Sequence, residues 1–551
     1  MAVLLLPRSW RFLMAPDQKG RAPGASRMLI QPPPRRGSED LSNDDAASRA
    51  GGPAGALRAI LLFLVVAAAA RAMGFVPAVI DTDEGLFIVQ AREWLRGAWP
   101  LVAVWDMHPV GAPGLIALGM ALMGESLEAV RMTGLIATVA TSCALHAMML
   151  SAGAPRAVGL AAGVLYAAHS VLVGGLITGT EILMAPFTAG AIAIGVAGAM
   201  RAVREGAAPG WGGLLAMGLL VGIGLTVKPV IFPMGCLAFA LCVLPAWWRG
   251  VIRFGRVLAY AGSYALACLV PTLMLGVAYA LHGAFGDFLD GSFLAPMRYS
   301  GGRLGWNMAA RQAGVAVVIL LWPFLLAGAG LALTRSLALS GWPGRIASVG
   351  LLWFAMATAA IVGPGMYYQH YFLIWIPPLA VLAALGAQAV SQRAGPALAP
   401  ALLAGIVGVA SVTAWQYEFA QRFQRGIGFH QPDPVREVAA ILAREGAPGD
   451  SLFVANYHSA VYFLARAAVP TRYIFPAHLT GFFHTVPPED MNAEISRILA
   501  AQPRFIVVDR GWWDTMHAGA QARIGAALAQ GYSLVGRVQE ERGPVEVWRR
   551  D

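Results

Sequence analysis

Charged side chains are scarce in this chain. Asp, Glu, Lys and Arg make up 13% of its 551 residues, whereas 57% are hydrophobic. Average soluble domains carry about 25% charged residues, so this composition argues against a soluble fold. Cysteine is scarce as well. The four cysteines all fall in apolar stretches without metal-ligand spacing, which argues against a zinc site or a disulfide scaffold.

Long apolar runs are what the chain has in place of charge. A helix needs about 20 apolar residues to cross roughly 30 Å of hydrocarbon. Runs of this kind lie near 56–78, 129–150, 156–176, 181–201, 211–227, 229–247, 257–281, 312–334, 346–363, 371–390 and 397–415. They predict a polytopic α-helical membrane protein with about 11 spans.

The basic residues predict the orientation of these spans. The formal net charge is +10, but Lys and Arg are spread over short loops instead of forming one nucleic-acid-binding face. The basic loops lie at Arg156, 201–204, 248–256, 335–345 and 392–393. The positive-inside rule places them and the N-terminus in the cytoplasm. Loops 79–128, 177–180, 282–311 and 364–370, and the chain after about residue 416, are then outside a bacterial inner (plasma) membrane.

Composition divides the chain into three parts. Residues 1–55 are rich in Pro, Gly, Ser and Arg and predict a disordered cytoplasmic tail. Residues 56–415 are the membrane domain, whose first outside loop should contain juxtamembrane helices near 84–97 and 110–123. Residues 430–551 alternate between helix and strand patterns, with strands expected at 452–456, 505–509, 534–538 and 545–548. They predict a periplasmic α/β domain, and no Gly-rich phosphate fingerprint marks it as a nucleotide site.

An acidic group follows the first predicted span. Asp81, Asp83 and Glu84 stand where a carboxylate beside hydrocarbon must be solvated, paired or bound to a cation. One interpretation is that they cap the next helix, because acids complement the dipole at a helix N-terminus. The other is a catalytic site, which the residues farther along the chain favour.

An ordered series of motifs accompanies the acidic group. Its pieces are 83–87 (DEGLF), 91–100 (AREWLRGAWP), 104–109 (VWDMHP), 179–181 (GTE), 224–229 (GLTVKP) and 367–372 (YYQHYF). This series, over residues 80–380, resembles the GT-C membrane glycosyltransferases that use polyprenyl-phosphate sugars. That group, similar to glycosyltransferase family 39, includes protein O-mannosyltransferases and the lipid A aminoarabinose transferase.

The resemblance implies roles for three acids. Asp83 would act at the acceptor as general base or positioning group, and Glu84 would support it directly or through a divalent metal cation held by both. Glu181 would face the catalytic cavity, although it could instead cap its own helix. The donor would be a polyprenyl-phosphate-linked sugar. The acceptor would be a protein, lipid A or another envelope glycan, and nucleic acid would have no part.

The leaving lipid phosphate needs cations nearby. The predicted topology offers Lys228, Arg131, Arg298, Arg303 and His370 near the outer face. Lys228 could otherwise extend to the interface, the two loop arginines could be solvated, and His370 could belong to an aromatic belt.

The chain departs from the resemblance at His108. It has His108-Pro109-Val110 where the family commonly has Lys-Pro-Pro. An imidazole can still donate a hydrogen bond to a phosphate. The alternative is a local polar pair with Asp106.

Two rival functions are left open. A transporter or flippase would also be polytopic, but it would be expected to carry an internal inverted repeat, and none is visible in the sequence. A non-catalytic envelope assembly protein, in which the C-terminal domain recruits a partner, stays open because of the change at His108.

Overall fold

The computed structural model describes residues 52–551 apart from 335–340, 396–397, 427, 429–430 and 482–487. The tail predicted over residues 1–55 therefore lies outside the described residues up to residue 51. Of the four residues that remain, Gly52 is the N-cap of α3 and residues 53–55 form its first turn, so the prediction of a disordered tail is wrong for these three residues.

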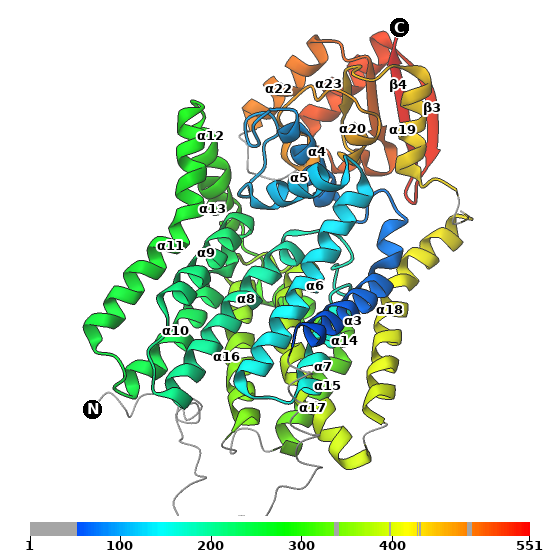
Figure 1. Ribbon diagram of the computed structural model, residues 1–551. Coiled ribbons are helices and arrows are strands. Elements are labelled where there is room, and N and C mark those ends of the chain that lie inside the picture. The colour runs from blue at the N-terminus through cyan, green and yellow to red at the C-terminus, as the bar shows by residue number, and fades with distance from the viewer. Residues whose placement is uncertain (1–51, 335–340, 396–397, 427, 429–430, 482–487) are drawn as a thin grey trace, which may run out of the picture.

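Apolar helices form the larger part of the molecule (Figure 1). They are α3 (Pro53–Arg71), α6 (Leu127–Ala152), α7 (Arg156–His169), α8 (Thr180–Met200), α9 (Trp211–Val227), α10 (Phe232–Trp248), α11 (Phe254–Leu281), α14 (Trp306–Ile319), α15 (Leu321–Thr334), α16 (Trp342–Val362), α17 (Ile376–Ala394) and α18 (Leu398–Arg425). Short turns of helix accompany them: η2 (Ala72–Phe75), η3 (Arg201–Glu205), η4 (Pro229–Ile231), α12 (Phe285–Leu289), η5 (Asp290–Leu294), α13 (Ala295–Ser300) and η6 (Gln369–Trp375).

These helices confirm a polytopic membrane protein. In the described part of the chain, 7 helical segments are long and apolar enough to cross a bilayer, and an eighth follows if α14 and α15, bent by 81°, form one span. Every predicted span coincides with a helix or a pair of helices. However, α7 and α9 have only 14 and 17 residues, which is short for a full crossing.

Local signals in the sequence set where α6 begins and ends. The side chain of Ser126 accepts a hydrogen bond from the backbone N–H of Ala129, so it satisfies one of the free donors of the first turn. At the other end Gly153 has φ 90°, a left-handed conformation that glycine adopts without strain. These two signals fix the ends of α6, which packs beside the loop that precedes α8.

That loop is held by a buried arginine at the end of α3. Arg71 donates hydrogen bonds to the carbonyl oxygens of Gly175, Leu176 and Ile177 over distances of 2.8 to 3.0 Å. Irregular backbone inside a membrane protein needs such partners, because no water reaches it. The arginine therefore fixes the backbone that leads to Thr180 and the start of α8.

The helices α4 (Thr82–Leu95) and α5 (Gly111–Met123) lie between the bundle and the C-terminal domain (Figure 1). Both confirm the helices predicted in the first outside loop. The apolar stripe of α4 is mostly buried against protein, including α20 (Ala460–Leu464), where the sequence predicted a helix at the membrane interface. A Cβ atom on Gly85 would stand 2.9 Å from the backbone N of Ala460, so only glycine permits this approach.

The C-terminal part folds around a sheet of four strands in the order β1-β2-β4-β3. The strand β1 is parallel to β2, and the other pairs are antiparallel. Its elements are α19 (Pro434–Glu445), β1 (Leu452–Val454), α20, α21 (Pro476–Leu479), α22 (Pro488–Ala500), β2 (Phe505–Asp509), η7 (Arg510–Thr515), α23 (Ala518–Gly531), β3 (Tyr532–Gln539) and β4 (Pro544–Arg550). The predicted α/β domain is confirmed, with all four strands at the expected places.

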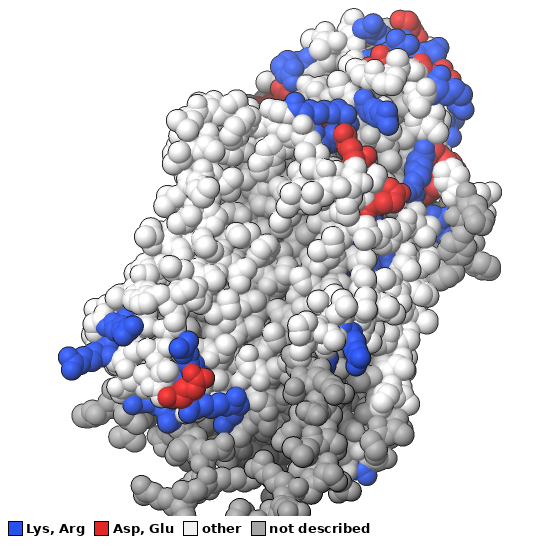
Figure 2. All heavy atoms as spheres, in the orientation of Figure 1, with Lys and Arg blue, Asp and Glu red and all other residues white. Residues whose placement is uncertain are grey.

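The surface in Figure 2 separates charge from apolar area. Acidic and basic side chains gather over the C-terminal domain and at the opposite end of the molecule, and the band between them carries few. A band without charge is what a bilayer requires of the surface it covers. The connection between α10 and α11 lies at the end away from the C-terminal domain (Figure 1).

Candidate active site

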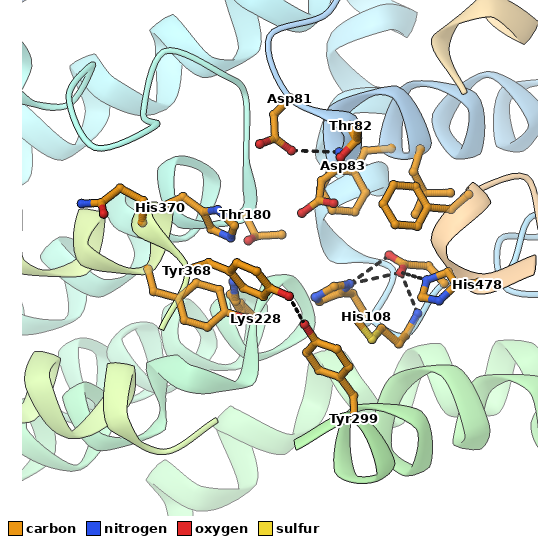
Figure 3. A pocket seen from close by; sticks show the side chains of 17 residues that line it. Asp81, Thr82, Asp83, His108, Thr180, Lys228, Tyr299, Tyr368, His370 and His478 are labelled. Atoms are coloured by element: carbon orange, nitrogen blue, oxygen red, sulfur yellow. Dashed lines mark hydrogen bonds and ion pairs between the residues drawn. The ribbon is translucent and has the colours of Figure 1, made fainter. Parts of the chain in front are cut away.

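A cavity of about 330 Å³ lies where the loop 79–128, the start of α8, the segment before α17 and the C-terminal domain meet (Figure 3). Its lining is rich in ionisable and aromatic side chains. The lining residues are Asp81, Thr82, Asp83, Leu86, Phe87, Asp106, Met107, His108, Thr180, Lys228, Tyr299, Tyr368, Gln369, His370, Tyr371, Phe475 and His478. The predicted residues Asp83, His108, Lys228 and His370 are therefore brought together from four distant segments.

Asp83 reaches the cavity from the first turn of α4. Asp81 is the cap of this helix and accepts a hydrogen bond from the Asp83 backbone N–H at 3.0 Å, so the capping interpretation holds for Asp81. The carboxylate of Asp83 is left to face the cavity. Burial raises the pKa of Asp83 to about 7, and Asp81 acts in the same direction, while His108 and Lys228 oppose it.

Lys228 stands in the break between α9 and η4. Its ammonium group forms an ion pair with Glu181, and it lies over the ring of Tyr371 at 4.3 Å from the ring centre. The hydroxyl of Thr180 donates to the other carboxylate oxygen of Glu181 at 2.9 Å. Lys228 lines the cavity but Glu181 does not, so Glu181 acts on the cavity through the lysine that it holds.

His108 is held by a buried carboxylate. Asp106 is 2% exposed, and its two oxygens lie 3.2 and 3.1 Å from Nδ1 of His108. Burial alone would raise the pKa of Asp106, but His108 and His478 hold it well below its ordinary range. Burial alone would lower the pKa of His108, but Asp106 raises it above its ordinary value. The local pair of His108 and Asp106, one of the two interpretations of the sequence, is thus formed, and it faces the cavity.

Glu84 and Arg131 lie outside the cavity lining. Glu84 is fully buried and forms an ion pair with Arg131, and it also accepts a hydrogen bond from the backbone N–H of Thr178 at 3.0 Å. The structure therefore turns Glu84 toward α6, away from Asp83. The two successive residues of α4 point about 100° apart, as helical geometry requires.

This arrangement corrects the expected metal pair. Among the residues that the structure describes, no three His, Cys, Asp or Glu side chains come together as a metal site. The carboxylates that line the cavity with Asp83 are those of Asp81 and Asp106, not that of Glu84. Magnesium is commonly held by one or two carboxylates plus substrate phosphates, so a cation here would need the donor to complete its ligands.

The two loop arginines are also outside the cavity lining. Arg298 pairs with Asp290 at 2.8 Å, and Arg303 donates to the carbonyl oxygen of Gly363. Both side chains are exposed, as the alternative interpretation of solvated residues expects. Between them Tyr299 reaches the cavity and donates a hydrogen bond to the hydroxyl of Tyr368 at 2.9 Å.

Sequence reasoning missed the contribution of the C-terminal domain. Phe475 and His478 line the cavity from the segment that ends in α21. The backbone N–H of Trp105 donates to the carbonyl of Arg472 at 2.8 Å, which ties this segment to the first outside loop. Neither histidine spacing nor periodicity signals it, because the contact joins residues more than 350 positions apart.

The fold and the cavity define a class of protein: a polytopic membrane protein in which acidic and basic side chains together line one cavity beside the C-terminal domain. Residues 107–275 match the family model described as dolichyl-phosphate-mannose-protein mannosyltransferase. The matched range contains His108, Arg131, Glu181 and Lys228. It confirms the resemblance to the GT-C membrane glycosyltransferase family.

The chain is similar to the apo oligosaccharyltransferase of Archaeoglobus fulgidus, with 13% identity, 87% of this chain and 73% of that chain covered, and a TM-score of 0.48. It is similar to ArnT from Cupriavidus metallidurans bound to undecaprenyl phosphate, with 13% identity, coverage of 89% and 97%, and a TM-score of 0.38. No curated protein sequence matches the chain.

Proposed function

We propose that this protein transfers a sugar from a polyprenyl-phosphate donor to an envelope acceptor. The observation that carries the proposal is the shared cavity, in which the Asp83 carboxylate faces Lys228 and His108 within a chain matched by a glycosyltransferase family model. Sugar transfer from a lipid phosphate needs both a base for the acceptor and cations for the leaving phosphate.

Asp83 takes the proton in the proposed reaction. The acceptor hydroxyl or amine attacks the anomeric carbon of the sugar while its proton passes to the Asp83 carboxylate. A bond from the acceptor oxygen or nitrogen to that carbon forms, and the bond from the carbon to the phosphate oxygen breaks. With its pKa raised to about 7, Asp83 is a stronger base than an ordinary aspartate, and about half of it is ionised at neutral pH.

Lys228 and His108 stabilise the negative charge that develops on the departing lipid phosphate. Each is held by a carboxylate behind it, Glu181 for the lysine and Asp106 for the histidine. Preorganised cations of this kind stabilise developing negative charge without rearranging during the reaction. His370 stacks on Tyr368 with ring centres 5.8 Å apart and completes this side of the cavity.

We also propose that the cavity faces the periplasm. The connection between α10 and α11, which contains Arg249 and Arg253, lies at the end away from the C-terminal domain, and this supports the orientation (Figure 1). The same experiment that tests the function would identify the acceptor and the sugar. Mass spectrometry of envelope glycans, lipids and glycoproteins from a deletion strain should lack one glycosylated product that the wild-type strain contains. An unchanged profile would favour the non-catalytic assembly role.

Lys228→Gln is expected to weaken binding of a polyprenyl phosphate by about 10–100-fold, as the loss of a charged hydrogen bond predicts. The substitution also leaves Glu181 buried without its cation, so protein stability must be separated from affinity. The double variant Lys228→Gln with Glu181→Gln removes the stranded charge and should bind as weakly as the single variant. Restored binding in the double variant would contradict a phosphate contact by Lys228.

The rate of transfer should depend on pH with two limits. Protonated Asp83 cannot act as base, so kcat/KM should rise about tenfold per pH unit below pH 7 and level off near the pKa of about 7. At higher pH the rate should fall again as His108, whose pKa is raised by Asp106, loses its proton and its attraction for phosphate. Initial rates measured from pH 5 to 10 check both limits. A flat profile between pH 5 and 7 would rule out Asp83 as the base.

A further inference from the structure

The C-terminal domain reaches the cavity through one short segment. Arg472 donates hydrogen bonds to the carbonyl of Leu101 and to Asp287 at 2.8 Å, and its own carbonyl accepts from the N–H of Trp105. The indole of Trp105 then packs between Tyr473 and His478, with ring centres 5.5 and 5.0 Å away. The segment 472–478 thus holds the loop that carries Asp106 and His108 by hydrogen bonds and ring contacts.

His478 makes the polar contact between this segment and Asp106. Its side chain is 1% exposed, and its Nε2 atom lies 3.9 Å from Oδ1 of Asp106. The same carboxylate holds Nδ1 of His108 on its other side. These contacts place the Asp106 carboxylate between His478 and His108. Figure 3 shows the ring of His108 between His478 and Lys228, facing the cavity.

A carboxylate placed between two imidazoles has little freedom to rotate. Asp106 additionally accepts a hydrogen bond from the backbone N–H of Met107 at 2.6 Å. With these partners Asp106 fixes both the orientation and the charge of the His108 ring, and leaves its Nε2–H as the donor that meets a ligand.

We propose that His478 of the C-terminal domain is a positioning residue for the donor phosphate: through Asp106 it aims His108 at the phosphate oxygens. This inference rests on the proposed function, because it deepens the role of His108 in that site. The C-terminal domain is then part of the donor site and does more than recruit a partner.

The test uses the purified full chain in detergent and undecaprenyl phosphate as the probe. His478→Leu keeps the volume of the side chain but removes its polar atoms, and is expected to weaken binding about 10-fold. His478→Gln places an amide N–H near the former Nε2 and should bind within about twofold of wild type. His282→Gln is the matched control, because that exposed histidine of the α11 cap is outside the cavity lining.

A double-variant cycle separates positioning from structural support. If His478 acts through His108, adding His478→Leu to a His108→Ala variant should cause no further loss of binding. A further 10-fold loss in that background would overturn the inference, because His478 would then act independently of His108. If His478→Leu fails to fold, Asp106→Asn provides the same test, and unchanged binding by that variant would equally overturn the inference.

The outcome also distinguishes this inference from the proposed function. If wild type binds undecaprenyl phosphate and Lys228→Gln weakens binding, the donor site stands, and normal binding by His478→Leu contradicts only the role of His478. If wild type shows no binding at all, the proposed function itself fails.

Discussion

Asp83→Asn is expected to reduce the rate of sugar transfer by about 10²–10⁴-fold, the range that general acid–base groups contribute. The amide has nearly the same shape as the carboxylate but cannot take a proton from the acceptor. Binding of the lipid phosphate should remain, because Lys228 and His108 are untouched. Single-turnover rates with a polyprenyl-phosphate sugar, measured alongside lipid affinity, check this expectation.

The control for this substitution is Asp514→Asn, a change of the same kind at an exposed position outside the cavity lining. It should leave the rate unchanged. The thermal stability of Asp83→Asn should not fall, because burial already disfavours the charge of this carboxyl. Transfer at the wild-type rate by Asp83→Asn would remove Asp83 from the mechanism.

Glu84→Gln, one residue farther along, should act on stability instead. The substitution leaves Arg131 buried without its counter-charge, and removing one partner of a buried ion pair typically costs about 3–5 kcal/mol. Arg131 is 3% exposed and Glu84 is fully buried, so solvent cannot replace the lost partner. Thermal unfolding of the detergent-solubilised protein should show a clearly lower midpoint.

Glu125→Gln is the matched control for Glu84→Gln. Glu125 also pairs with an arginine, Arg96, at 3.3 Å, but the two side chains are 41% and 46% exposed. Exposed pairs contribute at most about 1 kcal/mol, so the midpoint should hardly move. Equal midpoints for the two variants would mean that the buried pair is not a structural link.

Apolar length predicted the membrane helices because the thickness of the bilayer sets the length of apolar helix that can cross it. Every apolar run became a helix, and the strands beginning at Leu452 and Phe505 appeared where β-branched and aromatic residues cluster. Helix lengths were less predictable. A short helix such as α7 is surrounded by other helices, so its composition carries little information about where it must end.

The site was predictable where one segment carries its own chemistry. Asp83, Lys228 and His370 each stand in a local motif, and each lines the cavity. The separate roles of Asp83 and Glu84 were not predictable, because either residue could face inward until the packing of α4 is known. His478 was not predictable either, since only the docking of a distant domain brings it to Asp106.

The contact between Gly85 and Ala460 has a consequence for biosynthesis. The cavity combines residues 81–108 with Phe475 and His478, which are translated more than 350 positions later. The helix that carries Asp83 is covered by α20 only after the C-terminal domain has folded. A nascent or truncated chain therefore holds its spans in the membrane with an open, incomplete site.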